Sequence, residues 1–280
     1  MWRESIATYR ASLALVDDAG LQARLDQVVA EHGFRIADTT VDSEAADPRI
    51  CVVFSEPLPA GDTDLSSYVV VDEAPQAAVE TDNSQLCITG VRHGLRYHIR
   101  VRSGLPSASG EQLRADAELN LYVPDRTPFV GFANNAYVMP AGLGGGLPIT
   151  SVNASSADIA IYRIGDRNIA TAVRSGIFRG TLDGYSAEDV ANRYGQEEFT
   201  GTLELDQGSP NDMTVTAIPV SETLGTLEPG AYVITAKVTG GKAEYWQEMA
   251  TQWFIVTDLG ITTVSGEDGV HAFVRSLTSA

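Results

Sequence analysis

Short apolar runs separated by turn residues dominate most of the chain. Between residues 49 and 123 the runs cover residues 50–54, 68–71, 78–80, 85–89, 97–101 and 118–123. Glycine, proline and asparagine stand between them, and no long helical period interrupts the pattern. This spacing is typical of a small sandwich of two antiparallel sheets. We therefore expect a first β-sandwich domain over residues 49–124.

A second set of runs begins after a boundary marked by Pro124 and Pro128, which favour extended backbone and lack an amide donor. Its members are residues 129–132, 136–139, 149–152, 159–164, 199–205, 213–218, 232–238 and 253–256. Within this set the pattern changes between residues 167 and 194, and Ser186 begins a helix-capping pattern. We expect a second sandwich over residues 125–257 that contains one short helix.

The first 48 residues carry the clearest helical signal. Asp17 and Asp18 are suitable capping acids, and Gly33 is a natural stop. The apolar positions between them have helical spacing: Leu21, Leu25, Val28 and Val29. We predict one amphipathic helix in an amino-terminal segment of residues 1–48, followed by a short strand near residues 34–41. Because so short a helix is marginal alone, it should pack on the next domain.

Residues 250–277 indicate that one β-domain ends and another begins with almost no linker. A buried run at 253–256 is followed by a turn at 258–260, a second run at 261–264, a tight turn at 266–269 and a third run from residue 270. A sandwich needs about 100 residues, far more than the segment from 258 to 280 supplies. We expect residues 258–280 to be the truncated start of a third domain.

Composition agrees with a globular chain and limits the partners. The 280 residues are 44% hydrophobic and 20% charged, which is ordinary for folded domains. No run approaches the roughly 20 apolar residues of a membrane span, and no export signal opens the sequence. The net charge of −18 disfavours nucleic acid and anionic membrane surfaces, since both are polyanions.

The two cysteines lie in strand-like runs of one predicted domain. A disulfide between Cys51 and Cys87 is therefore geometrically reasonable in an oxidising compartment. The alternative is two separate buried thiols, because cysteine packs as a small hydrophobe. Cysteine spacing matches no zinc pattern, and the histidines are scattered: His32, His93, His98 and His271. We expect neither a metal nor a cofactor.

No pattern in the sequence supports catalysis. The glycine-rich stretch at 142–146 precedes a strand instead of a helix, so it does not fit a phosphate loop. Ser186 lies in a sequence one glycine short of a nucleophile elbow, and a helix N-cap explains it better. No pair of carboxylates has the apolar flanks of a general acid. We predict that the chain is not an enzyme and has no catalytic residues.

Aromatic residues leave one binding alternative open. A carbohydrate- or cell-surface-binding sandwich would be favoured if Tyr185, Tyr245 and Trp246 formed an exposed cluster on one rim. The aromatic spacing is irregular, and Gly240 and Gly241 precede the pair at 245–246. We therefore expect that pair to lie in a solvated loop with partial packing.

Several segments together resemble the amino-terminal region of bacterial alpha-2-macroglobulins. They are RICVVFSEPL, GLPSASGE, LYVPDRTPFVGF, IYRIGDRN, LEPGAYVITA and ATQWFIVTDLGITTVSGEDGVHAFVRSL. These segments follow the family order over residues 9–277. The resemblance implies a mainly β chain of tandem antiparallel macroglobulin-like, immunoglobulin-like sandwiches with a short amino-terminal helical segment.

The same resemblance implies a function for the parent protein. Known members are periplasmic, many are anchored by lipid to the inner membrane, and they trap proteases through a bait region and, in one subgroup, a thioester. The thioester motif is Cys-x-Glu-Gln, whereas Cys51 precedes Val-Val-Phe and Cys87 precedes Ile-Thr-Gly. We expect a non-catalytic scaffold whose partners are other domains of the parent, with target proteases engaged only by the full-length protein.

Overall fold

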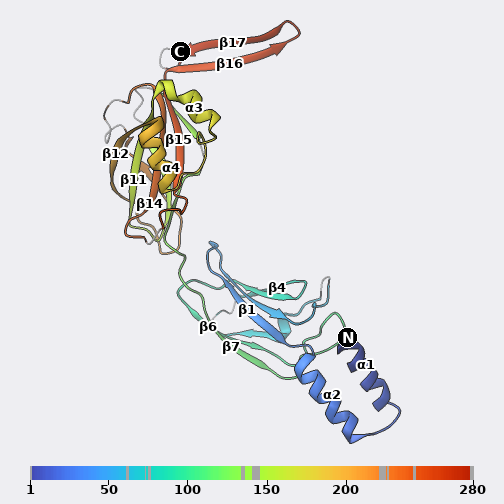
Figure 1. Ribbon diagram of the computed structural model, residues 1–280. Coiled ribbons are helices and arrows are strands. Elements are labelled where there is room, and N and C mark those ends of the chain that lie inside the picture. Colours follow the sequence, from blue (N-terminus) through green and yellow to red (C-terminus); the bar gives the residue numbers. More distant parts are fainter. Residues whose placement is uncertain are drawn as a thin grey trace. The chain divides into compact units, whose positions relative to one another are not determined.

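A computed structural model describes residues 2–60, 63–72, 74, 77–133, 136–140, 146–220, 225, 227–241 and 244–277. Most of the glycine-rich stretch considered above, residues 142–145, lies outside this described part. The chain divides into two compact units, Met1–Arg126 and Thr127–Ala280, each described here by itself (Figure 1). Within the described residues no helix is long and apolar enough to cross a membrane.

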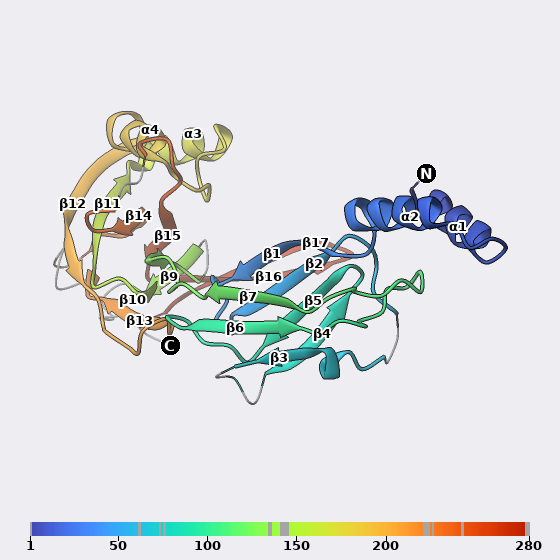
Figure 2. The same cartoon turned by 90° about the horizontal axis from the view of Figure 1, so that it is seen from below.

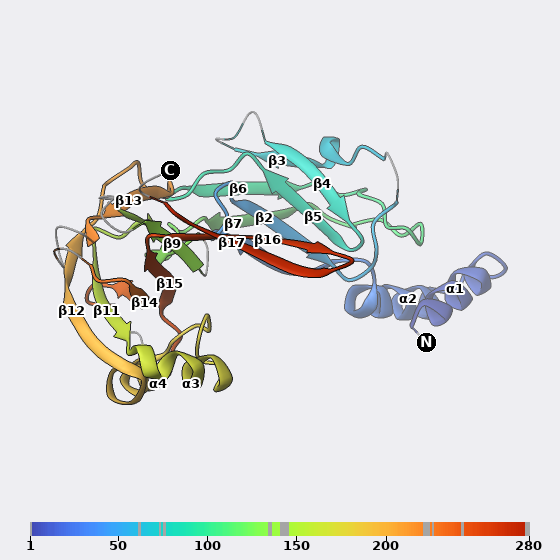
Figure 3. The same cartoon turned by 90° about the horizontal axis from the view of Figure 1, so that it is seen from above.

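Unit 1 is a sandwich of two antiparallel sheets (Figures 2 and 3). The first sheet has the order β1-β2-β5-β4, with β1 Ile36–Asp42, β2 Arg49–Phe54, β5 Gln85–Thr89 and β4 Ala78–Asp82. The second has the order β3-β6-β7, with β3 Val69–Val71, β6 Arg96–Val101 and β7 Ala117–Tyr122. A 3-10 turn, η1 Ser66–Tyr68, precedes β3.

The core of unit 1 comes from the inward positions of both sheets. Ile50 and Val52 of β2 are fully buried, and they share one apolar cluster with Ile99 and Val101 of β6. The period of two along each strand sends these side chains to the same face, as the alternation in the sequence predicted. The mainly β, antiparallel sandwich fold class is therefore confirmed.

The first sandwich begins earlier than the sequence suggested. We expected it to start at residue 49, but β1 pairs antiparallel with β2 from Ile36↔Phe54 to Asp42↔Arg49. As an outer strand of its sheet, β1 has four of its seven residues exposed, so its apolar alternation is weak. Residues 36–42 therefore belong to the sandwich and not to the helical segment.

Two helices precede the sandwich where one was predicted. The expected helix is α2, Ala19–His32, and Asp18 caps it by accepting hydrogen bonds from the amides of Gly20 and Leu21 at 2.8 and 3.0 Å. The additional helix is α1, Trp2–Leu13. Only Ile6 of α1 is fully buried, which explains why no apolar period revealed it.

The helical pair has a small apolar core of its own, and side-chain ion pairs attach it to the sandwich. Its buried residues form a separate apolar cluster: Ile6, Leu25, Val28 and Val29. Arg3 Nε donates to Glu56 Oε1 at 3.2 Å, and Arg10 makes a two-bond pair with Glu111, one bond being 2.8 Å. Glu56 is only 6% exposed. A buried carboxylate needs such partners, so these contacts fix the pair's position.

Unit 2 is also a sandwich, with one sheet larger than the other. The three-stranded sheet has the order β13-β10-β8, with β13 Thr214–Ile218, β10 Leu147–Val152 and β8 Phe129–Gly131. The five-stranded sheet has the order β12-β11-β14-β15-β9, with β12 Gly195–Glu204, β11 Ser156–Ile164, β14 Gly230–Val238, β15 Ala250–Thr257 and β9 Ala136–Pro140. Only β9, next to β15, is parallel to its neighbour among these described strands.

Apolar residues pack against both faces of the five-stranded sheet. The inner face contributes Ile159, Ile161 and Ile234 to a cluster shared with the three-stranded sheet. On the outer face, Val233 and Trp253 pack with residues of an insertion between β11 and β12. Trp253 Nε1 donates to the carbonyl of Gly180 at 2.8 Å.

The insertion contains more helix than expected. We predicted one short helix near residues 186–194, whereas the insertion holds a 3-10 turn η2 Asp166–Asn168, α3 Ile169–Arg174, α4 Gly184–Asp189 and a π-helical turn η3 Val190–Tyr194. The N-cap of α4 is Asp183, which corrects the assignment of Ser186. Ser186 is the third helical residue, and it closes a capping box in which each side chain accepts from the other residue's amide at 2.8 Å.

The ionic attachment of the helical pair predicts a local weakness. Replacing Arg3 and Arg10 together by alanine should loosen α1, because it removes the pair with Glu111 and leaves the buried Glu56 carboxylate without its cation. Hydrogen exchange should rise roughly fivefold in α1 while the amides of β2 and β5 keep their protection. Arg24→Ala, which removes a hydrogen bond to Gln27 within α2, is the matched control. Equal loss of protection throughout unit 1 would contradict separate cores.

Candidate functional site

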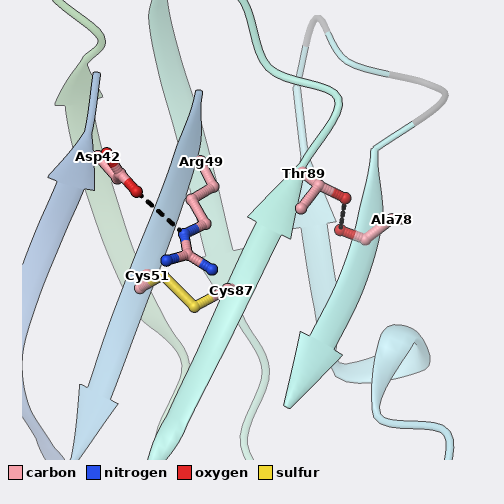
Figure 4. The surroundings of a disulfide bond; sticks show 6 residues. All are labelled: Asp42, Arg49, Cys51, Ala78, Cys87 and Thr89. Atoms are coloured by element: carbon pink, nitrogen blue, oxygen red, sulfur yellow. Dashed lines mark hydrogen bonds and ion pairs between the residues drawn. A yellow bond between two sulfur atoms is a disulfide. The ribbon is translucent and has the colours of Figure 1, made fainter. Parts of the chain in front are cut away.

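The two cysteines face each other on neighbouring strands of unit 1. In the register of β2 and β5, Cys51 is directly opposite Cys87, and their sulfur atoms are bonded (Figure 4). Both side chains lie on the sheet face opposite Ile50 and Val52, yet they are only 5% and 7% exposed. The outer face beside them carries an ion pair of Arg49 with Asp42 at 3.3 Å. The cysteine pair therefore holds two strands together.

A groove of about 780 Å³ lies on the outer face of the five-stranded sheet in unit 2. Residues of the insertion line one side of it, among them Ala187, Glu188 and Asn192. Its floor consists of cross-strand rows: Thr200 and Thr235 flank Ala160, while Thr202 and Lys237 flank Asp158. A volume of this size is within the range of small-molecule and peptide sites.

A loop after β14 forms one wall of the groove and is tied to the insertion by backbone hydrogen bonds. The amide of Gly184 donates to the carbonyl of Tyr245 at 2.9 Å, and the amide of Met249 donates to the carbonyl of Leu182 at 2.8 Å. A Cβ at position 184 would approach the Tyr245 carbonyl oxygen to 2.7 Å. Glycine at 184 therefore permits this close approach.

The aromatic residues singled out in the sequence meet at this wall. Tyr185 and Tyr245 contact edge to face, with ring centroids 4.6 Å apart and planes at 89°. They are 61% and 52% exposed, and Trp246 in the same loop is 68% exposed. The exposed cluster that would favour a binding function is thus present in part, although the two tyrosine rings do not form one flat surface.

Carboxylates dominate the electrostatics of the groove. Its lining contains four acidic residues and one cation: Asp158, Glu188, Glu197, Glu244 and Lys237. Tyr245 Oη donates to Glu188 Oε2 at 2.9 Å, and this bond to a carboxylate raises the pKa of Tyr245. Burial, and then the charge of Glu197, raise the pKa of Tyr162 on the floor. Both shifts favour the neutral phenol, because burial and a neighbouring carboxylate each disfavour the phenolate.

The sequence did not reveal the groove, because its parts are far apart along the chain. Asp158, Glu188 and Glu197 come from three different elements, and no local motif connects them. The catalytic alternatives are not brought together either. Ser186 bonds to Asp183 inside its capping box, and none of the four histidines lines the groove.

A second exposed surface is the hairpin that ends the described chain, β16 Leu259–Gly266 with β17 Gly269–Ser276 (Figure 1). The register places Ile261 opposite Val274 and Ser265 opposite Val270, so these residues share one face. Leu259, Ile261, Val270 and Val274 are each more than half exposed. The hairpin therefore presents an apolar face that no described residue covers.

Comparisons with known proteins relate most of unit 2 to a family. Residues 131–254 match the family described as the bacterial alpha-2 macroglobulin MG2 domain. This match assigns residues 131–254 to the MG2 domain family. The resemblance found in the sequence is thereby confirmed, and the matched region contains the whole groove.

Relatives and solved structures of alpha-2-macroglobulins extend the match beyond the MG2 domain. Alpha-2-macroglobulin of Xylella fastidiosa strain 9a5c is 22% identical over 258 residues, 88% of this chain. The Escherichia coli protein is 20% identical over 236 residues, 81% of this chain. The chain spans only 15% and 14% of the length of these curated relatives.

A crystal structure of a Salmonella alpha-2-macroglobulin shares the fold, with a TM-score of 0.59 and 17% identity. The likeness covers 87% of this chain and 14% of that one. A second Salmonella structure, reacted with methylamine, has the same TM-score and coverage. The likeness shows that this chain shares its fold with solved alpha-2-macroglobulin structures.

The cysteine pair predicts a stability difference confined to unit 1. It closes a separation of 36 residues, which corresponds to roughly 3 to 4 kcal/mol on the chain-entropy model. Replacing both cysteines by alanine should lower the free energy of unfolding of unit 1 by about that amount. Unit 2, followed through its buried Trp253, is the internal control. Two free thiols in mass spectrometry of the non-reduced protein would refute the pairing.

Proposed function

We propose that this chain is a non-catalytic scaffold region of a bacterial alpha-2-macroglobulin, a periplasmic inhibitor that traps proteases. The observation that carries the proposal is the MG2 match over the second of two tandem sandwich units. Only a few residues join the two units, since the last strand of unit 1, β7, ends at Tyr122 and the first strand of unit 2, β8, begins at Phe129. Serial β-domains with short connections suit a structural role in a long chain.

The domain arrangement is part of the proposal. The first macroglobulin-like domain is the unit 1 sandwich, and the second is the unit 2 sandwich with its helical insertion. Residues 258–280 supply the first strands of a third. An isolated two-stranded hairpin is marginally stable at best, so the apolar face of β16 and β17 needs further strands. Those strands would come from the following part of the parent chain.

The cysteine pair supports a periplasmic location for the parent. Disulfides persist in oxidising compartments such as the bacterial periplasm. Neither cysteine is available as a thioester nucleophile, since Cys51 and Cys87 are bonded to each other and neither is followed by x-Glu-Gln. The bait region, the thioester of those relatives that have one, and the lipid anchor would lie elsewhere in the parent.

The proposed absence of protease trapping in this chain is directly testable. Trapping needs a long cleavable segment and a body that closes around the protease, whereas the described strands account for most apolar residues as closed sandwiches. Trypsin-like and elastase-like enzymes incubated with excess chain should keep full activity on a large protein substrate. Denatured chain at the same concentration controls for simple competition. Stoichiometric protection of the substrate would contradict the scaffold role.

The hairpin generates a second test. Ending the chain after Thr257 should leave the free energy of unfolding of unit 2 unchanged within about 0.5 kcal/mol, since the hairpin is outside the sandwich core. Extending the chain by about 100 residues of its parent should slow hydrogen exchange in β16 and β17, because a third sandwich would cover them. Unchanged exchange in the extended chain would argue against a third domain there.

A further inference from the structure

The groove on the MG2 domain has properties that a purely structural surface does not require. Its wall is fixed by the hydrogen bonds of Gly184 and Met249. Tyr245 of this wall lines the groove, and its exposed ring contacts the exposed ring of Tyr185 edge to face. Exposed aromatic groups held in a fixed geometry lose little conformational entropy on binding. The surface is thus preorganised for a ligand.

Charge selects among the possible ligands. Four carboxylates against one lysine favour a cation and repel phosphate, acidic sugars and nucleic acid. One of these carboxylates is held at the rim, where Glu188 Oε2 accepts a hydrogen bond from Tyr245 Oη at 2.9 Å. Aromatic faces also attract guanidinium and ammonium groups through the ring quadrupole. Cation binding therefore uses both the rim and the floor.

A neutral sugar fits the rim less well. Stacking of a sugar ring needs an open aromatic face, but the planes of Tyr185 and Tyr245 are at 89°, so the edge of one ring meets the face of the other. Trp246 offers one further exposed ring in the same loop. Sugar hydroxyls could bond to the carboxylates, yet they would gain nothing from the net charge.

The floor suits an extended segment. Three neighbouring strands present polar atoms on the floor: Thr200 and Thr202 of β12, Asp158 of β11 and Thr235 of β14. The volume of about 780 Å³ is large for a single ion and appropriate for a few residues. A second copy of this chain is a poor occupant, because two chains of net charge −18 repel each other.

We infer that the groove lined by Asp158, Glu188, Glu197 and Tyr245 binds an arginine- or lysine-bearing peptide segment of a partner protein. The basic side chain lies between the tyrosine rim and Glu188, where it makes a charge-assisted hydrogen bond. The neighbouring backbone of the segment crosses the threonine floor. This binding function is independent of the scaffold proposal, since it uses the MG2 domain alone.

The test is a titration of the whole 280-residue chain with the synthetic peptide acetyl-Gly-Arg-Gly-Arg-Gly-amide. Backbone NMR shifts should change around residues 184–188, 197–202 and 245–247, with saturation by about 1 mM peptide. A peptide with citrulline at both arginine positions has nearly the same shape and no charge. It should bind at least tenfold more weakly. Equal binding of the citrulline peptide, or no shifts at about 5 mM arginine peptide, would overturn the inference.

A pair of neighbouring carboxylates provides the matched variants. Glu197 lines the groove, whereas Glu198 on the same strand does not line it and accepts a hydrogen bond from Gln196. Glu197→Gln should weaken peptide binding roughly two- to fivefold, the effect of losing one exposed charge partner. Glu198→Gln should leave the affinity within experimental error. Equal effects of both variants would show only a general attraction to an acidic protein and would contradict a defined site.

Two further variants test the contribution of the rim. Glu188→Gln removes charge and keeps an acceptor for Tyr245, so it should weaken the peptide with little change in fold. Gly184→Ala places a Cβ against Tyr245, displaces the wall and should abolish the shifts at residues 245–247. Wild-type peptide affinity in both variants would exclude the rim as the cation site. Saturable binding of neutral oligosaccharides with no response to the arginine peptide would replace the inference by a sugar site.

Discussion

Burial of both faces of one five-stranded sheet determines the organisation of the MG2 domain. A strand such as β11 carries Ile159 and Ile161 on its inner face, while Tyr162 and Ile164 join the outer cluster. The three-stranded sheet covers the first set, but only a short helical insertion covers the second. The insertion packs on part of that face, and the groove lies on another part of it. The groove is therefore a consequence of incomplete cover.

In unit 1, apolar contacts hold the two sheets together, whereas ion pairs attach the helical pair to them. Its two sheets share a continuous apolar core, whereas the helical pair has its own small cluster and contacts the sandwich through Arg3 and Arg10. Ion pairs at a surface contribute little free energy compared with apolar burial. Unit 1 is accordingly a stable sandwich with a more weakly held helical attachment, and the cysteine pair reinforces the sandwich only.

Local patterns in the sequence predicted the strands well, and the site poorly. The runs at 85–89 and 97–101 match β5 and β6. Strand β6 alternates between exposed and buried side chains, whereas β5 is a short apolar run in which Leu86, Cys87 and Ile88 are all buried. Helix α1 gave little signal, because just one of its residues is fully buried. Ser186 was misassigned because Asp183 also caps, and only the folded geometry distinguishes them. The groove depends on cross-strand rows such as Thr202, Asp158 and Lys237, which register alone brings together.

The most direct test of the scaffold account is the structure of the full-length parent by cryo-electron microscopy, before and after exposure to a protease. The account predicts that both sandwiches keep their strand pairing and that Cys51 remains bonded to Cys87. It also predicts that the protease cleaves and contacts other parts of the parent chain. The hairpin of β16 and β17 should continue into a third sandwich. Cleavage within residues 127–257, or refolding of the insertion around the protease, would contradict a scaffold role for this region.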